Sequence, residues 1–172
     1  RAIHGGLGGV RWVGLRPEEC GRVSAAAGMV WSPLGSFLLC GSSADIVAAR
    51  NHGVRIALGS DGGPSGSKNL LGELKVARVA LDFLGASLTD EDLVRMVTTA
   101  PAAMLGWDGH VGSLEQGKRA DLLILDGAVQ DPYGQLVAAF ENQILAVVVD
   151  GIPRLARRSL MIVEPTSQEA VR

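Results

Sequence analysis

Short apolar runs alternate with helical patterns over the first two thirds of the chain. Residues 29–31 and 54–58 are apolar runs of strand length, and small or polar residues follow each of them. Between residues 70 and 84 apolar side chains return at helical spacing, which predicts a helix with one face in a core. The order strand, loop, helix, repeated along the chain, is typical of a parallel sheet or barrel in an α/β protein.

Cap residues and helix-breaking residues predict where further helices begin and end. Ser42 or Ser43 is expected to cap the second of them. Thr89, with Asp92 three residues later, forms a capping-box-like start for the third. The expected helices are 17–27 with Gly28 after it, 43–51 with Gly53 after it, 90–98, and 101–105.

The composition changes at Gly106, after which the chain reads as short strands and turns. Residues 121–126 and 144–149 are apolar runs, and Asp150-Gly151 predicts a hairpin turn leading into a partner strand over 152–160. We therefore expect a small β module over residues 106–163, followed by a polar tail over 164–172.

Composition and charge exclude several classes of protein. The 172 residues are 47% hydrophobic and 20% charged with a net charge of −2, which indicates a globular chain without a concentrated basic stripe for nucleic acid. No apolar run reaches the roughly 18 residues of a membrane span, and the N-terminus has no signal-peptide layout. Two cysteines, Cys20 and Cys40, form no disulfide framework, so a reducing, cytoplasmic compartment is expected.

Asp61 is the first charged residue after the apolar run 54–58. A carboxylate at the C-terminal end of a strand lies where α/β folds hold their chemistry, and it can bind a divalent metal or accept a proton. A helix N-cap explains the same local pattern equally well. His4 would end an earlier parallel strand and open on the same face, although a lone His in a Gly-rich loop is more often simply exposed.

The sequence resembles the amidohydrolase superfamily, in the branch of cytosine deaminase-like, chlorohydrolase-like and imidazolonepropionase-like enzymes. The similarity covers nearly the whole chain up to Leu160. It is carried by residues 3–5, 31–33, 44–45, 53–54, 58–61, 64–75, 99–106 and 112–122.

The resemblance implies the C-terminal part of a (β/α)8 TIM-like barrel plus part of a small β-sandwich. Residues 1–105 would be the last βα units of a barrel truncated at its N-terminus, an interpretation that agrees with Arg rather than Met at position 1. By the same resemblance His4 contacts substrate or the reacting water, and Asp61 binds metal and shuttles protons. The expected cofactor is a divalent metal, zinc, which lowers the pKa of bound water to about 7.

The sequence also departs from the family pattern. No His-x-His and no fifth-strand His occur, while His52 is expected at a helix C-terminus and His110 in an exposed turn. Asp61 is then a metal ligand whose partner ligands are absent from this chain, and the chain alone should be inactive. Lys68 and Glu73 are either site residues or a surface pair at a helix start. Residues 35–37, Gly-Ser-Phe, replace a Ser-Asn common in relatives, which puts a substrate contact there in doubt.

We therefore expect the intact protein to hydrolyse C–N non-peptide bonds of a small cyclic or amidine-like molecule, by deamination or by amide or ring hydrolysis. It is expected to be a homo-oligomer without nucleic-acid or membrane partners. An alternative is a non-catalytic homologue that acts as a scaffold or assembly subunit. A third interpretation, a stand-alone partial barrel, would need an oligomer to cover its open strand edges.

Overall fold

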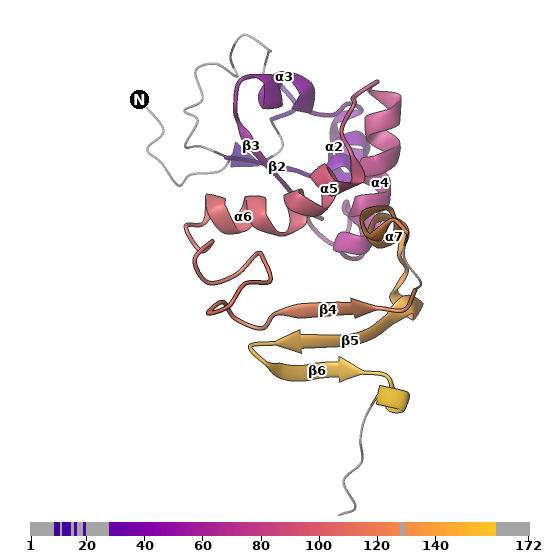
Figure 1. Cartoon of the computed structure of the whole chain (residues 1–172). Coiled ribbons are helices and arrows are strands. Elements are labelled where there is room, and N and C mark those ends of the chain that lie inside the picture. The colour runs from indigo at the N-terminus through magenta and orange to yellow at the C-terminus, as the bar shows by residue number, and fades with distance from the viewer. Residues whose placement is uncertain are drawn as a thin grey trace, which may run out of the picture.

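The computed structural model describes residues 9–10, 12–14, 16, 19, 28–127 and 130–160, and it contains two three-stranded sheets. In Figure 1 the parallel sheet and most helices form the upper part, and the antiparallel sheet forms the lower part. The strands are β1 (Gly9–Val10), β2 (Gly28–Trp31), β3 (Arg55–Leu58), β4 (Leu122–Leu125), β5 (Ile144–Val149) and β6 (Ile152–Ala156). The helices are α2 (Pro33–Cys40), α3 (Ile46–Asn51), α4 (Leu70–Phe83), α5 (Asp90–Val97), α6 (Thr99–Met104) and α7 (Pro132–Ala138), with 3-10 turns η1 (Glu141–Gln143) and η2 (Arg158–Leu160).

The first sheet is parallel, in the order β1-β2-β3, which confirms the α/β prediction. Strands β2 and β3 pair in register from Gly28 opposite Arg55 to Trp31 opposite Leu58, close to the predicted runs. Both strands therefore end at the same edge of the sheet. The strand expected to end at His4 and, apart from residue 19, the helix expected over 17–27 lie outside the described residues.

The core lies between the parallel sheet and the helices that follow it. Trp31 is fully buried, and its Nε1 donates to the Ser43 hydroxyl at 2.8 Å. Helix α4 confirms the predicted amphipathic pattern, because its inward positions are fully or almost fully buried while its two ends emerge into solvent. The buried positions of α4 are Leu71, Leu74, Ala77, Ala80 and Leu81.

Helix α5 confirms the predicted capping box. The Thr89 hydroxyl accepts the Asp92 N–H at 3.2 Å, and the Asp92 carboxylate accepts the Thr89 N–H at 3.0 Å. The start of α5 therefore has reciprocal partners for two backbone donors that a helix end otherwise leaves unpaired. Leu93 follows directly and is fully buried in the core.

The cap predicted for α3 was wrong. Asp45, rather than Ser42 or Ser43, precedes the helix, and its carboxylate accepts the Ala48 N–H at 2.8 Å. The Ser43 hydroxyl instead accepts the Trp31 indole N–H.

Helix α2 was not predicted. It begins with Pro33, whose missing N–H suits the first helical position, and ends at Gly41, which has a left-handed φ of 67°. Its eight residues are mostly apolar and lack polar positions at a helical period, so no amphipathic pattern marked it.

The second sheet is antiparallel, in the order β4-β5-β6, and its hairpin turn is Asp150-Gly151 as predicted. Both turn residues have positive φ, 55° and 75°, as a two-residue hairpin requires. Strand β6 ends at Ala156, and a 3-10 turn replaces the rest of the expected strand. Helix α7 lies between β4 and β5 in sequence, but it packs against α4 and α5 (Figure 1). No described helix has the length and apolar character that crossing a membrane requires.

Candidate functional site

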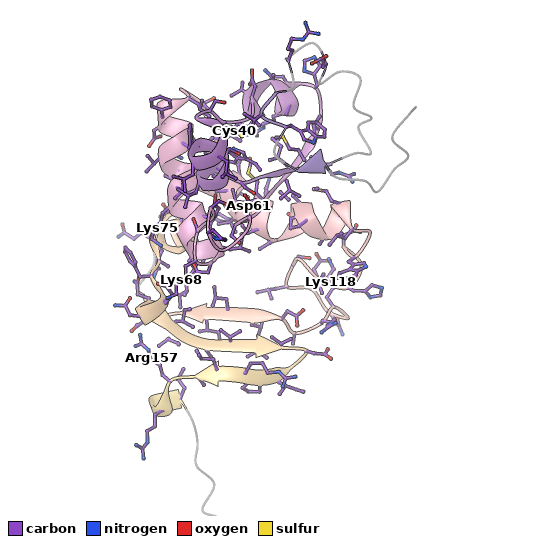
Figure 2. The ribbon with its side chains drawn as sticks, turned by 180° about the vertical axis from the view of Figure 1, so that it is seen from behind. Cys40, Asp61, Lys68, Lys75, Lys118 and Arg157 are labelled. Carbon is purple, nitrogen blue, oxygen red and sulfur yellow. The ribbon has the colours of Figure 1, made fainter. Side chains whose placement is uncertain are left out.

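Asp61 lies just beyond the C-terminal end of β3, in the helical half of the molecule (Figure 2). Its backbone is left-handed, with φ of 58°. Among the described residues the other non-glycine with positive φ is Asp150, which the hairpin turn explains. Asp61 has no such turn around it, and unusual backbone conformations of this kind concentrate at functional sites.

The helix-cap interpretation of Asp61 is wrong. The next helix, α4, begins at Leu70, and its cap is Asn69, whose side chain accepts the Gly72 N–H at 2.9 Å. Asp61 instead points toward the first turn of α2. The Ser65 hydroxyl donates to its Oδ2 at 3.4 Å.

Gly35, in the first turn of α2, makes the room that Asp61 occupies. A Cβ on Gly35 would lie 2.5 Å from Asp61 Oδ2 and 3.2 Å from its Cβ, so a larger residue at position 35 would collide with the carboxylate. The first turn of a helix also carries the positive end of its dipole, which favours a carboxylate there. Gly35, the first residue of the departing segment 35–37, therefore has a steric role at this site.

The loop after Asp61 folds back on its own beginning. Ser65 and Gly66 donate their N–H groups to the Gly62 carbonyl at 3.0 and 2.8 Å. A Cβ on Gly66 would lie only 1.5 Å from the Ser60 carbonyl oxygen, so the loop closes in this form because position 66 is glycine.

Glu73 is fully buried, and Lys68 is 85% exposed. The proposed surface pair is therefore wrong. Lys68 forms an ion pair with Glu141 at 3.4 Å, and the Glu73 carboxylate accepts backbone N–H groups from Leu34 at 3.0 Å and Ser67 at 3.3 Å. The sequence placed Glu73 in the first turn of a helix but could not show that two other segments would enclose it.

Two buried hydroxyls lie in the two segments that donate to this carboxylate. The Oγ atoms of Ser36, in α2, and Ser67, in the loop, have no hydrogen-bond partner among the described residues. Ser36 lies two residues after Leu34, which donates to Glu73, and Ser67 itself donates its N–H to Glu73. The region between α2, the Asp61 loop and α4 is therefore polar although it is enclosed.

The histidines do not join Asp61 in the described structure. His4 lies outside the described residues, and its role stays a prediction. His52 is the C-cap residue of α3, with Nδ1 at 2.8 Å from the Ala48 carbonyl, and His110 is exposed in a turn, both as expected. In the described ranges no group of three His, Cys, Asp or Glu side chains could hold a metal ion. This part of the chain thus offers Asp61 as a single carboxylate and does not form a complete zinc site.

A separate apolar cavity of about 770 Å³ lies between α4, α6 and β4. Leu74, Pro101, Trp107 and Leu122 line it, whereas Asp61, Gly35 and Glu73 do not. The cavity is therefore distinct from the Asp61 region, and its lining is mostly apolar.

Comparison with known proteins identifies the family. Residues 33–152, well over half of the chain, match the model of the amidohydrolase family. The chain therefore belongs to this family. The match includes α2, the Asp61 loop and α4, the three segments that meet at the Glu73 carboxylate.

Curated relatives are hydrolases and deaminases. An S-triazine hydrolase from Gordonia rubripertincta is 31% identical over 148 residues, covering 80% of this chain and 31% of the relative. A 5-methylthioadenosine/S-adenosylhomocysteine deaminase from Symbiobacterium thermophilum is 31% identical over 138 residues, covering 72% and 31%. The chain thus spans about a third of the length of these relatives.

Solved structures show the same fold. An adenosine deaminase from Xanthomonas campestris with bound zinc matches with a TM-score of 0.80 and 25% identity, over 92% of this chain and 39% of that one. A mutant atrazine chlorohydrolase from Arthrobacter aurescens, complexed with zinc and atraton, matches with a TM-score of 0.76 and 26% identity, over 87% and 36%. Zinc is therefore the metal bound in these neighbours.

Proposed function

We propose that this chain is the C-terminal part of a metal-dependent amidohydrolase that hydrolyses C–N bonds of a small cyclic or amidine-like molecule. The observation that carries the proposal is the Asp61 carboxylate, held at the C-terminal edge of a parallel sheet against Gly35. The matched relatives named for deamination and for triazine hydrolysis support this class of reaction.

The proposal includes an architecture. Residues 1–105 would be the last βα units of a (β/α)8 barrel, and residues 106–163 part of a β-sandwich. The parallel order β1-β2-β3 and the antiparallel order β4-β5-β6 support this division. The limited coverage of the matched relatives supports a longer parent protein.

In the complete enzyme Asp61 would be one zinc ligand, and the remaining ligands would come from other parts of that protein. Zinc, when bound, lowers the pKa of a water molecule to about 7. Asp61 would hold its charge beside the first turn of α2 and accept a proton during the reaction. His4 would contact the substrate or the reacting water.

The test compares Asp61→Asn with Asp108→Asn in the complete enzyme, since Asp108 is exposed in a turn far along the chain. Zinc content and turnover are measured with a panel of aminopurines, aminopyrimidines and s-triazines. We expect Asp61→Asn to lose turnover and weaken zinc binding, while Asp108→Asn keeps both. Unchanged turnover in Asp61→Asn would sink the assignment, and a wild type without zinc or turnover would favour the scaffold alternative.

A further inference from the structure

Three segments meet at the Glu73 carboxylate, which lies in the first turn of α4. Oε1 accepts the Leu34 N–H of α2 at 3.0 Å, and Oε2 accepts the Ser67 N–H of the loop after Asp61 at 3.3 Å. The side chain is fully buried. One carboxylate thus joins a helix start and a loop that lie 33 residues apart in sequence, at positions 34 and 67.

This arrangement is physically demanding. Burying a carboxylate is unfavourable unless hydrogen bonds replace its water, and here each oxygen receives one backbone donor. The Leu34 N–H lies in the first turn of α2, where backbone donors have no partner within the helix. A negative charge is favoured at that end of the helix, so Glu73 satisfies both the donor and the dipole.

The two anchored residues adjoin the two groups that contact Asp61. Leu34 immediately precedes Gly35. The Asp61 carboxylate lies against Gly35, with Oδ2 only 2.5 Å from where a Cβ on that glycine would be. Ser67 is two residues after Ser65, whose hydroxyl donates to Asp61 Oδ2. A shift of either anchor would therefore move one wall of the space that holds Asp61.

We propose that Glu73 is a positioning residue, which fixes the Asp61 carboxylate by locking the first turn of α2 to the Asp61 loop. The relevance of this lock to catalysis rests on the proposed function. The lock itself does not, because it consists of contacts within this chain.

The decisive variant is Glu73→Gln. Glutamine keeps the shape of the side chain, but its NH2 group would face one of the two backbone donors, so one anchor is lost. The control is Leu93→Ala, which removes a fully buried apolar side chain from α5, a helix outside the two segments that Glu73 joins. If Leu93→Ala fails to fold, Ile46→Val serves as a milder core control, since Ile46 is fully buried in α3.

Both variants are made in the complete enzyme and compared by three measurements at a temperature where each is folded: kcat/KM, zinc affinity, and amide hydrogen exchange resolved at residues 34–35 and 61–67. We expect Glu73→Gln to lower kcat/KM and zinc affinity by about 10- to 100-fold, the usual effect of losing a residue that orients a metal ligand. Exchange in both segments should accelerate. The control should leave kcat/KM, zinc affinity and the exchange rates of both segments unchanged, even when its melting temperature falls as far as that of Glu73→Gln.

The outcomes separate the two proposals. Wild-type exchange in both segments of Glu73→Gln would overturn the lock, whatever the activity. Faster exchange with unchanged kcat/KM and zinc affinity would overturn the positioning role, while the loss of turnover in Asp61→Asn would still support the proposed function. If the wild type has no turnover at all, the proposed function fails, and the exchange data alone then support or overturn the lock.

Discussion

The Asp61 carboxylate occupies the space that a side chain on Gly35 would fill. The two residues come from different elements, a loop after β3 and the first turn of α2, and a Cβ on Gly35 would approach Oδ2 to 2.5 Å. The same Cβ would also lie 3.2 Å from the Cβ of Asp61, a contact that rotation of the carboxylate alone does not relieve.

Gly35→Ala should therefore displace the Asp61 carboxylate. In the complete enzyme we expect kcat/KM to fall at least about tenfold, since misplacing a catalytic group by about 1 Å can cost a hundredfold. Gly63→Ala is the matched control, because Gly63 lies in the same loop with nothing within 4 Å of a Cβ. Equal activity of the two variants would show that Asp61 does not need this space.

Lys75 connects α4 to the segment after α7, on the side where Figure 2 also labels Lys68. Its Nζ donates to the Leu71 and Ala139 carbonyls and lies 4.3 Å from the centroid of the Phe140 ring. Lys75→Met should lower the free energy of unfolding by about 2 kcal/mol, because the buried Ala139 carbonyl loses its lysine donor and the ring loses its cation.

Lys68→Met is the control for this effect, since Lys68 is mostly exposed and its ion-pair partner Glu141 is exposed too. Its loss should cost at most about 1 kcal/mol. Urea unfolding measures both variants. A Lys75→Met variant as stable as Lys68→Met would mean that the contact contributes little.

Thr89→Ala should lower the free energy of unfolding by about 1 kcal/mol, because the Asp92 N–H loses its acceptor. The matched substitution is Thr98→Ala, at the N-cap of α6, where the side chain accepts no backbone N–H. We expect a smaller loss there. A loss well below about 1 kcal/mol for Thr89→Ala, measured by thermal unfolding, would argue that the Thr89 cap is energetically unimportant.

Asp92 should make stability depend on acid pH. Partial burial acts to raise the pKa of Asp92, but the Thr89 N–H and hydroxyl and the Arg50 guanidinium outweigh it and hold this pKa below its ordinary value. A lowered folded-state pKa stabilises the protein above the unfolded value, about 3.9, and this contribution is lost as the pH falls through the folded value.

Asp92→Asn should thus reduce stability at neutral pH and lose less on acidification below about pH 4 than the wild type. Unfolding measured across this range tests the sign. Glu115→Gln is the comparison at an exposed position, where the Ser113 hydroxyl and Lys118 lower the pKa of Glu115. Parallel pH profiles for wild type and Asp92→Asn would contradict the prediction.

Local features of the sequence predicted much of the fold. Strands β2 and β3 were recognisable as apolar runs, α4 by its period, α5 by its capping box, and the hairpin by Asp150-Gly151. These patterns succeed because the physical cause of each element lies within a few residues of it. Helix α2 carried no such pattern and was missed.

The candidate site, too, was predicted only in part from the sequence. The sequence by itself determined that Asp61 follows a strand, and the family resemblance gave it a role. Only the tertiary structure showed that it is no helix cap, that Gly35 faces it, and that Glu73 is buried between Leu34 and Ser67. Burial and steric contact depend on which segments, distant in sequence, pack together in the fold. Local periodicity and composition do not show which segments these are.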